Sequence, residues 1–225
     1  MADATGPEAV TRPTANEIYE RGLNHLLSSD DPASFHAVDE NGARRRLPLD
    51  RWLTEAPSEE ELLLERADGP VLDIGCGAGR HLVALGNRGI ASTGIEVSGL
   101  AVELARARGG TVIHGSVFDL TEKAAWQSAL LLDGNIGISG EPGRLLRRTA
   151  ELLRPCGNAL VELDPPGSET KVLNLRLENS DDVSEWFPWA WVGVDGIESI
   201  AAEARLKVSE VWPIGQRWFA ELLRN

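Results

Sequence analysis

Short apolar runs alternate with amphipathic segments along the middle of this 225-residue chain. Runs of β-branched and aliphatic residues indicate buried strands, and apolar residues at helical spacing indicate the helices that follow them. The expected strands are 71–74, 91–95, 111–114, 129–132 and 159–163. The expected helices are 78–88, 98–108, 121–126 and 142–153. Continuously apolar strands joined by helices predict a doubly wound, mostly parallel sheet that is covered on both faces.

The segment before this core follows a different pattern. Residues 1–15 are small and polar, which favours a disordered tail. We expect a helical N-terminal cap over 16–69, with helices at 17–27 and 58–66. Residues 28–50 show no clear period and are expected to be irregular.

The segment after the core is expected to extend the sheet. A β-hairpin insertion is predicted within about 168–193, where 171–177 alternates in polarity and 184–193 is rich in aromatic residues. A helix at 195–204 and two strands, 208–212 and 217–222, should follow it.

A glycine-rich turn lies between the first core strand and its helix. Gly75, Gly77 and Gly79 follow Asp73 at alternate positions, so the backbone can approach a ligand closely beside the free N–H groups of a helix N-terminus. A dinucleotide fingerprint would carry its third glycine one residue later, where this chain has Arg80. The second strand ends in an acid about 20 residues further on, Glu96, at the offset typical of a residue that binds ribose hydroxyls.

Together, residues 73–79 and Glu96 resemble motif I and the ribose-binding acid of class I S-adenosylmethionine-dependent methyltransferases. The resemblance covers about residues 70–225. It implies a seven-stranded Rossmann-like α/β sheet with an antiparallel last strand. It also implies S-adenosyl-L-methionine as cofactor and S-adenosyl-L-homocysteine as product.

The resemblance further implies roles for individual residues at the cofactor. The glycine turn should lie against the methionine and ribose, Glu96 should accept hydrogen bonds from the ribose hydroxyls, and Val97 should pack on the adenine. Ser116 stands where many family members have an acid for the adenine amino group, so that contact is weaker or comes from Asp119 or the backbone. The expected cofactor-binding residues are Asp73, Gly75, Cys76, Gly77, Gly79, Glu96, Val97, Ser116, Val117 and Phe118.

The loop after the fourth strand lies where the methyl group meets the substrate in this family. Asp133 and Asn135 are candidates to orient a substrate hydroxyl or amine, with Asp133 as a candidate general base. A tight glycine loop that is capped by an aspartate is an equally weighted alternative.

Candidate substrate-pocket residues come from both flanking segments. Trp186, Trp189 and Trp191 could form a wall against a flat or apolar acceptor, or could cover the sheet edge as core. Tyr19 and Arg51 of the N-terminal cap are candidates to reach the same pocket, with packing and solvation as the alternatives.

Composition narrows the function. A net charge of −13, from 22 basic and 35 acidic residues, disfavours a nucleic-acid partner. No apolar stretch approaches the length of a membrane span, which predicts no membrane association. Cys76 and Cys156 are interpreted as reduced thiols of a cytoplasmic protein, and no His/Asp/Glu cluster has metal-ligand spacing, so no metal is expected. The strong preference for arginine over lysine is typical of GC-rich bacterial genomes.

The sequence therefore predicts a methyltransferase that alkylates an O, N or C atom of a small-molecule acceptor, in bacterial secondary metabolism, as a monomer or homodimer. One alternative keeps the fold but uses the bound cofactor structurally, as a cyclase or lyase-like enzyme would. Another is a nicotinamide-dependent oxidoreductase, which Arg80 and the antiparallel ending disfavour.

Overall fold

A computed structural model describes residues 12–29 and 34–224. Most of the predicted disordered tail, residues 1–11, lies outside the described residues. The helices are α1 (Ala15–Ser28), α2 (Leu49–Leu53), α3 (Ser58–Leu64), α4 (Arg80–Asn87), α5 (Gly99–Ala107), α6 (Pro142–Leu152) and α7 (Ile197–Glu203). The strands are β1 (Phe35–Asp39), β2 (Arg44–Leu47), β3 (Val71–Ile74), β4 (Ser92–Glu96), β5 (Val112–His114), β6 (Trp126–Leu131), β7 (Leu153–Leu163), β8 (Lys171–Glu178), β9 (Phe187–Trp191), β10 (Leu206–Ile214) and β11 (Arg217–Arg224).

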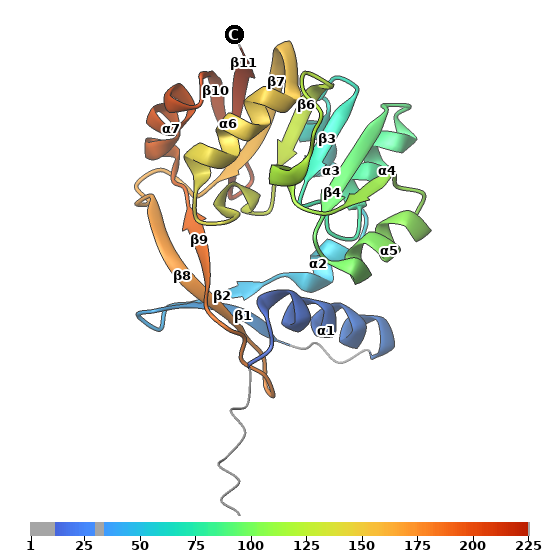
Figure 1. The fold of residues 1–225 in the computed structure, drawn as a ribbon, viewed down its shortest axis with the longest axis vertical. Coiled ribbons are helices and arrows are strands. Elements are labelled where there is room, and N and C mark those ends of the chain that lie inside the picture. Colours follow the sequence, from blue (N-terminus) through green and yellow to red (C-terminus); the bar gives the residue numbers. More distant parts are fainter. Residues whose placement is uncertain (1–11, 30–33, 225) are drawn as a thin grey trace, which may run out of the picture.

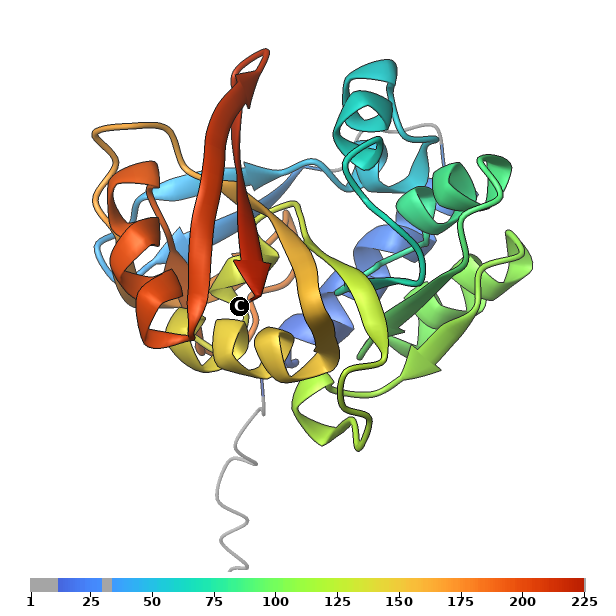
Figure 2. The same cartoon turned by 90° about the horizontal axis from the view of Figure 1, so that it is seen from above.

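Seven strands form the central sheet in the order β10-β11-β7-β6-β3-β4-β5. The five strands from β7 to β5 are parallel, whereas β11 runs antiparallel between β7 and β10. The predicted fold class, a doubly wound seven-stranded sheet with an antiparallel last strand, is confirmed. Figure 1 shows this sheet and its helices in the upper half of the molecule, and Figure 2 shows them from above.

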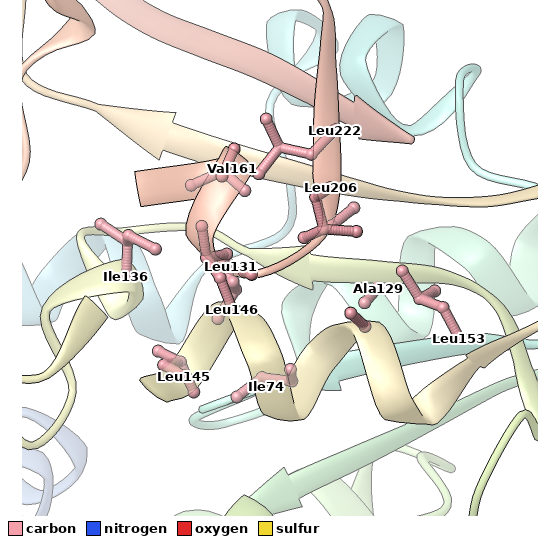
Figure 3. Packing of buried hydrophobic residues seen from close by; sticks show 14 of the residues in the cluster. Ile74, Ala129, Leu131, Ile136, Leu145, Leu146, Leu153, Val161, Leu206 and Leu222 are labelled. Carbon is pink, nitrogen blue, oxygen red and sulfur yellow. The ribbon is translucent and has the colours of Figure 1, made fainter. Parts of the chain in front are cut away.

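Both faces of the sheet are buried, as the continuously apolar strands predict. Along β6, Ala129 and Leu131 point toward α6 and α7, while Leu130 packs on the opposite face with Leu64 and Leu85 of α3 and α4. Figure 3 shows the first of these clusters, in which the leucines of α6 lie over the strands. Because these strands are parallel, the carboxyl ends of β3, β4, β6 and β7 lie at one edge of the sheet.

A second sheet lies opposite this edge and corrects two predictions. It has four antiparallel strands in the order β2-β1-β8-β9, so residues 28–50 are not irregular and the N-terminal cap is not purely helical. The four residues of β2 include three exposed arginines, so its sequence lacks the apolar residues that indicate a strand. The predicted β8–β9 hairpin is confirmed, with Lys171 paired to Trp191. Figure 1 shows this sheet and α1 below the central sheet.

The predicted helix over 121–126 is also wrong. A short 3-10 helix, η1, occupies Val117–Asp119 instead, and Trp126 begins β6. Ala124 has a positive φ of 48°, and the N–H groups of Ala124 and Ala125 donate to the backbone at the end of α6. Trp126, the large apolar residue at the end of the predicted helix, is buried in the core as part of β6.

Candidate active site

The glycine turn after β3 has the backbone that only glycine adopts freely. Gly75, Gly77 and Gly79 have φ values of +72°, +52° and +82°. A Cβ atom on Gly75 would lie 2.6 Å from Asn135 Nδ2, and one on Gly79 would lie 2.8 Å from Ala105 Cβ. The turn is therefore held tightly between the β6 loop and α5.

Glu96 ends β4 with its carboxylate against this turn. It is buried and accepts hydrogen bonds from the backbone N–H groups of Gly77 (3.0 Å), Val97 (2.8 Å) and Ser98 (2.9 Å). Burial raises the pKa of this carboxyl, and the three N–H donors act in the opposite direction. The predicted ribose-binding acid is thus fixed in place beside the glycine turn.

A cavity of about 590 Å³ lies between the two sheets. The central sheet lines it with the glycine turn, Glu96 and the loops after β5, β6 and β7, and the smaller sheet lines it with apolar and aromatic side chains. Of the predicted site residues, the structure brings Tyr19, Arg51, Asp73, Gly75, Cys76, Gly77, Glu96, Val97, Ser116, Val117, Asp133, Asn135, Trp189 and Trp191 to its lining.

Three predicted site residues lie elsewhere. Gly79 packs against Ala105 of α5, behind the turn. Phe118 packs against the core below α6, with the Arg144 guanidinium 4.3 Å from its ring centroid. Trp186 is 42% exposed and lies beneath Arg176, so it is not part of the cavity wall.

Both predicted catalytic residues have partners within the protein. Asn135 Nδ2 donates to the carbonyl oxygens of Ile74 and Gly75, each at 2.9 Å, and so supports the glycine turn. Asp133 forms ion pairs with Arg80 at 2.5 Å and with Arg217 at 3.3 Å. This geometry gives each residue a positioning role, and a direct role at the substrate stays a prediction.

Behind Asp133 lies a buried charge cluster that the sequence analysis missed. Glu60 of α3 is 1% exposed and forms ion pairs with Arg51, Arg80, His81 and Arg217. Although burial alone would raise it, the pKa of Glu60 lies well below its usual range because these cations stabilise the carboxylate. Glu60 is one of three consecutive acids in the first turn of α3, Glu59–Glu61, and no local pattern distinguishes it from its neighbours.

His81 connects this cluster to the glycine motif. Its Nε2 lies 3.1 Å from Glu60 Oε2, and its Nδ1 lies 3.5 Å from Asp73 Oδ2. Burial lowers the pKa of the imidazole, but the hydrogen bonds to the two carboxylates outweigh it and raise the pKa to about 9. His81 is therefore a cation at neutral pH, and it balances the buried motif acid. Its position directly after the glycine motif and Arg80 was the available signal.

The comparisons with known proteins agree with this geometry. A family model described as "Methyltransferase domain" matches residues 71–157, the segment from β3 into β7. No curated protein matches the chain by sequence.

Solved structures of methyltransferases share the fold of the whole chain. A S-adenosylmethionine-dependent methyltransferase from Bacteroides fragilis, in complex with S-adenosyl-L-homocysteine, is 22% identical with a TM-score of 0.79, covering 96% of this chain and 98% of its own. The 1,6-didemethyltoxoflavin-N1-methyltransferase of Burkholderia thailandensis is 16% identical with a TM-score of 0.59, and the match covers 100% of this chain and 98% of that protein. A possible histamine N-methyltransferase of Thermotoga maritima is 15% identical with a TM-score of 0.61, covering 93% and 99%.

Residues 71–157 therefore match a methyltransferase domain, and the chain has the fold of class I S-adenosylmethionine-dependent methyltransferases. The predictions of this enzyme class and of its cofactor are confirmed at that level. The glycine turn and Glu96, at the edge of a cavity large enough for a small ligand, fit the cofactor. Within 12–29 and 34–224, no helix has the length and apolar character needed to cross a membrane.

Proposed function

We propose that the protein transfers a methyl group from S-adenosylmethionine to a small-molecule acceptor held between its two sheets. The observation that carries this proposal is the buried Glu96 carboxylate, which faces the glycine turn inside a cavity that both sheets line. A carboxylate only accepts hydrogen bonds, so it suits two vicinal ribose hydroxyls. When bound, the cofactor supplies an electrophilic methyl group on a good leaving group.

The chain's own residues would contribute positioning and the exclusion of water. Glycine at 75 and 77 lets the turn approach the cofactor, and Tyr19 of α1 covers the turn from the other side, since a Cβ on Gly77 would lie 3.3 Å from its hydroxyl oxygen. Ile138, Leu175 and other apolar residues line the acceptor side. Holding donor and acceptor in near-attack geometry in a dry cavity accounts for much of the rate enhancement that such a transfer needs.

Three observations support a small acceptor. The cavity volume is in the range of sites for small molecules and must hold the cofactor as well. The net charge of −13 is unsuited to a nucleic-acid backbone. One protein of similar fold is named for the methylation of a small heterocycle, 1,6-didemethyltoxoflavin. With both cysteines free and an arginine-rich composition, we place this reaction in the bacterial cytoplasm, in secondary metabolism.

Calorimetry with S-adenosylhomocysteine tests the cofactor assignment. Glu96→Ala removes the ribose acceptor, so the affinity should fall by about 1–3 kcal/mol, which is roughly 5- to 150-fold. Because Glu96 also orders three backbone N–H groups, Glu96→Gln serves as a milder variant, and circular dichroism verifies that both are folded. Glu103→Ala on the exposed face of α5 is the matched control and should bind like wild type.

Methyl transfer itself is tested by incubation with methyl-labelled cofactor and candidate acceptors. Appearance of labelled product together with S-adenosylhomocysteine supports the proposal, whereas tight cofactor binding without turnover on any acceptor favours the alternative of a structural cofactor. Unchanged affinity in Glu96→Ala would show that the ribose assignment is wrong. Failure of the wild type to bind S-adenosylhomocysteine would overturn the proposed function altogether.

A further inference from the structure

The two halves of the cavity lie over different strands of the central sheet. The glycine turn, Glu96 and Ser116 lie at the carboxyl ends of β3, β4 and β5, which are adjacent at one end of the sheet order. On the other side, β6 is followed by Asp133, and β7 carries Glu162 and is followed by Asp164. A cofactor held by Glu96 therefore leaves the part of the cavity over β6 and β7 for the acceptor. This step rests on the proposed function.

Each carboxylate on the acceptor side already has a cationic partner. Asp133 is paired with Arg80, and Glu162 is paired with Arg217 at 2.5 Å. Both of these guanidinium groups come from the central domain and are largely buried, at 3% and 19% exposure. The charges of Asp133 and Glu162 are therefore balanced by fixed internal pairs.

A third ion pair, between Arg45 and Asp164, connects the two sheets. Arg45 of β2 donates from Nη1 and Nη2 to the two oxygens of Asp164, at 3.1 and 3.2 Å. The same guanidinium lies 4.3 Å from the centroid of the Trp191 ring. Asp164 is fixed by its backbone, which donates to Val192 O and accepts from the N–H of Val194. All three side chains, of Arg45, Asp164 and Trp191, line the cavity.

The aromatic wall beside this pair is also fixed. Trp189 forms a β-bridge with Ile138, and a Cβ on Gly137 would lie 2.4 Å from its indole nitrogen. Phe187 packs edge-on against Trp189, with ring centroids 6.1 Å apart. Flat, immobile rings beside balanced charges form a surface suited to a planar ligand without net charge.

We infer that the Arg45–Asp164 pair determines the charge specificity of the acceptor subsite and selects a neutral, planar acceptor. A cationic acceptor finds Asp164 already neutralised, and an anionic acceptor finds Arg45 occupied, so neither recovers the cost of leaving water. The Arg45–Asp164 pair differs from the pairs of Asp133 and Glu162 in two ways. Its arginine is half-exposed, and the pair connects the smaller sheet to the central sheet instead of lying within the core. Removing one partner should therefore expose the other to the ligand.

Three matched probes test the inference: 2-naphthalenemethanol (neutral), 2-naphthoate (anionic) and 2-naphthylmethylammonium (cationic). Their affinities are measured by calorimetry in saturating S-adenosylhomocysteine. Wild type should prefer the neutral probe. Arg45→Ala should shift the preference toward the ammonium probe, and Asp164→Asn should shift it toward naphthoate, each by roughly fivefold or more relative to the neutral probe.

Two controls separate this effect from structural damage. The double variant Arg45→Ala with Asp164→Asn restores neutrality and should prefer the neutral probe again. Arg44→Ala removes a neighbouring arginine on the same strand, which pairs with Glu178 outside the cavity at 3.5 Å, and should behave like wild type. Normal S-adenosylhomocysteine affinity in every variant shows that the fold and cofactor site are intact.

The possible failures are distinguishable. If wild type binds S-adenosylhomocysteine but the single variants keep the wild-type order of probes, the pair does not set specificity. If wild type binds none of the probes, or binds a charged one best, the neutral planar subsite is wrong. If wild type does not bind S-adenosylhomocysteine, the proposed function fails, and this inference fails with it.

Discussion

Several charged side chains at this site are buried and are held in place by ion pairs. Glu60, Arg80 and His81 are each no more than 3% exposed, and each charge has an opposite partner within the protein. Breaking such a pair costs about 3–5 kcal/mol because the remaining charge stays buried. The cluster lies directly behind the glycine turn and Asp133, so it holds these residues at a defined position.

Because of His81, the contribution of this cluster to the free energy of unfolding depends on pH. The folded-state pKa of His81, about 9, is above the value of roughly 6.5 expected in an unfolded chain. Protonation of His81 therefore favours the folded state. Its contribution to the free energy of unfolding is complete below about pH 6.5 and is lost as the pH rises through about 9. At about 1.4 kcal/mol per pKa unit, the contribution is on the order of 3 kcal/mol.

Urea unfolding of wild type and His81→Gln between pH 6 and pH 10 measures this contribution. The free-energy difference between them should be largest near pH 6 and shrink toward pH 10. Burial also raises the pKa of Cys76 and of Tyr19, which lowers stability at alkaline pH, but both groups are present in each protein and cancel in the difference. The exposed His114→Gln control should give a curve parallel to wild type. A constant difference for His81→Gln would contradict its charged state.

The residues that could be predicted from the sequence are those whose role depends on near neighbours. The glycine turn and Glu96 could be recognised because their spacing along the chain is fixed by one β-α-β unit. Glu60 and Arg217 are separated by 157 positions, and only the folded chain brings them together. Local spacing contains no information about such a pair.

At the level of elements, α1 is attached to the central domain through a helix terminus. Ser98 caps α5 with its own side chain, and Glu20 of α1 accepts from Ser98 Oγ at 2.9 Å and from the N–H of Leu100 at 3.3 Å. A carboxylate at a helix N-terminus interacts favourably with the free N–H groups and the helix dipole. This contact sets the position of Tyr19, the residue before Glu20 in α1, over the glycine turn.

Loss of this contact should affect ligand binding more than core stability. Glu20→Ala should weaken S-adenosylhomocysteine binding by about 1 kcal/mol, roughly fivefold, because α1 is no longer held over the cofactor. Hydrogen exchange should increase in α1 and leave β3 and β6 unchanged. Asn24→Ala, one turn further along the exposed face of α1, is the matched control. Faster exchange throughout the central sheet would instead indicate a general loss of stability.

The elements of the central sheet could be predicted more completely than those of the smaller sheet. Five buried strands with helices between them produce a repeated pattern, and the outcome departs from it mainly at 121–126. In the smaller sheet, β2 is Arg-Arg-Arg-Leu, and its pairing with β1 is visible only when both strands are placed beside β8. Short edge strands of this kind owe their structure to partners that are distant in sequence.

For the whole molecule, the smaller sheet is assembled from segments on both sides of the central domain. β1 and β2 precede the domain, β8 and β9 interrupt it after β7, and the cavity lies between the two sheets. The smaller sheet has its own apolar cluster, in which Phe35 and Leu49 pack with Leu175 and Leu177. A ligand in the cavity contacts both sheets, so its binding energy should stabilise them together.

Thermal unfolding with and without S-adenosylhomocysteine tests this coupling. At about 100 times the dissociation constant, a ligand that binds only the folded protein adds about 2.7 kcal/mol, which for a chain of this length raises Tm by roughly 5–10 °C. Tryptophan fluorescence reports on both sheets, because Trp52, Trp189 and Trp191 lie in α2 or β9 whereas Trp126, Trp212 and Trp218 lie in the central sheet. The helices of the central domain dominate the far-ultraviolet circular dichroism. Both signals should therefore shift by the same amount if the two sheets share the ligand. A part of the fluorescence change that does not shift with the circular dichroism would show that the cofactor binds the central domain alone and that the smaller sheet does not close over it.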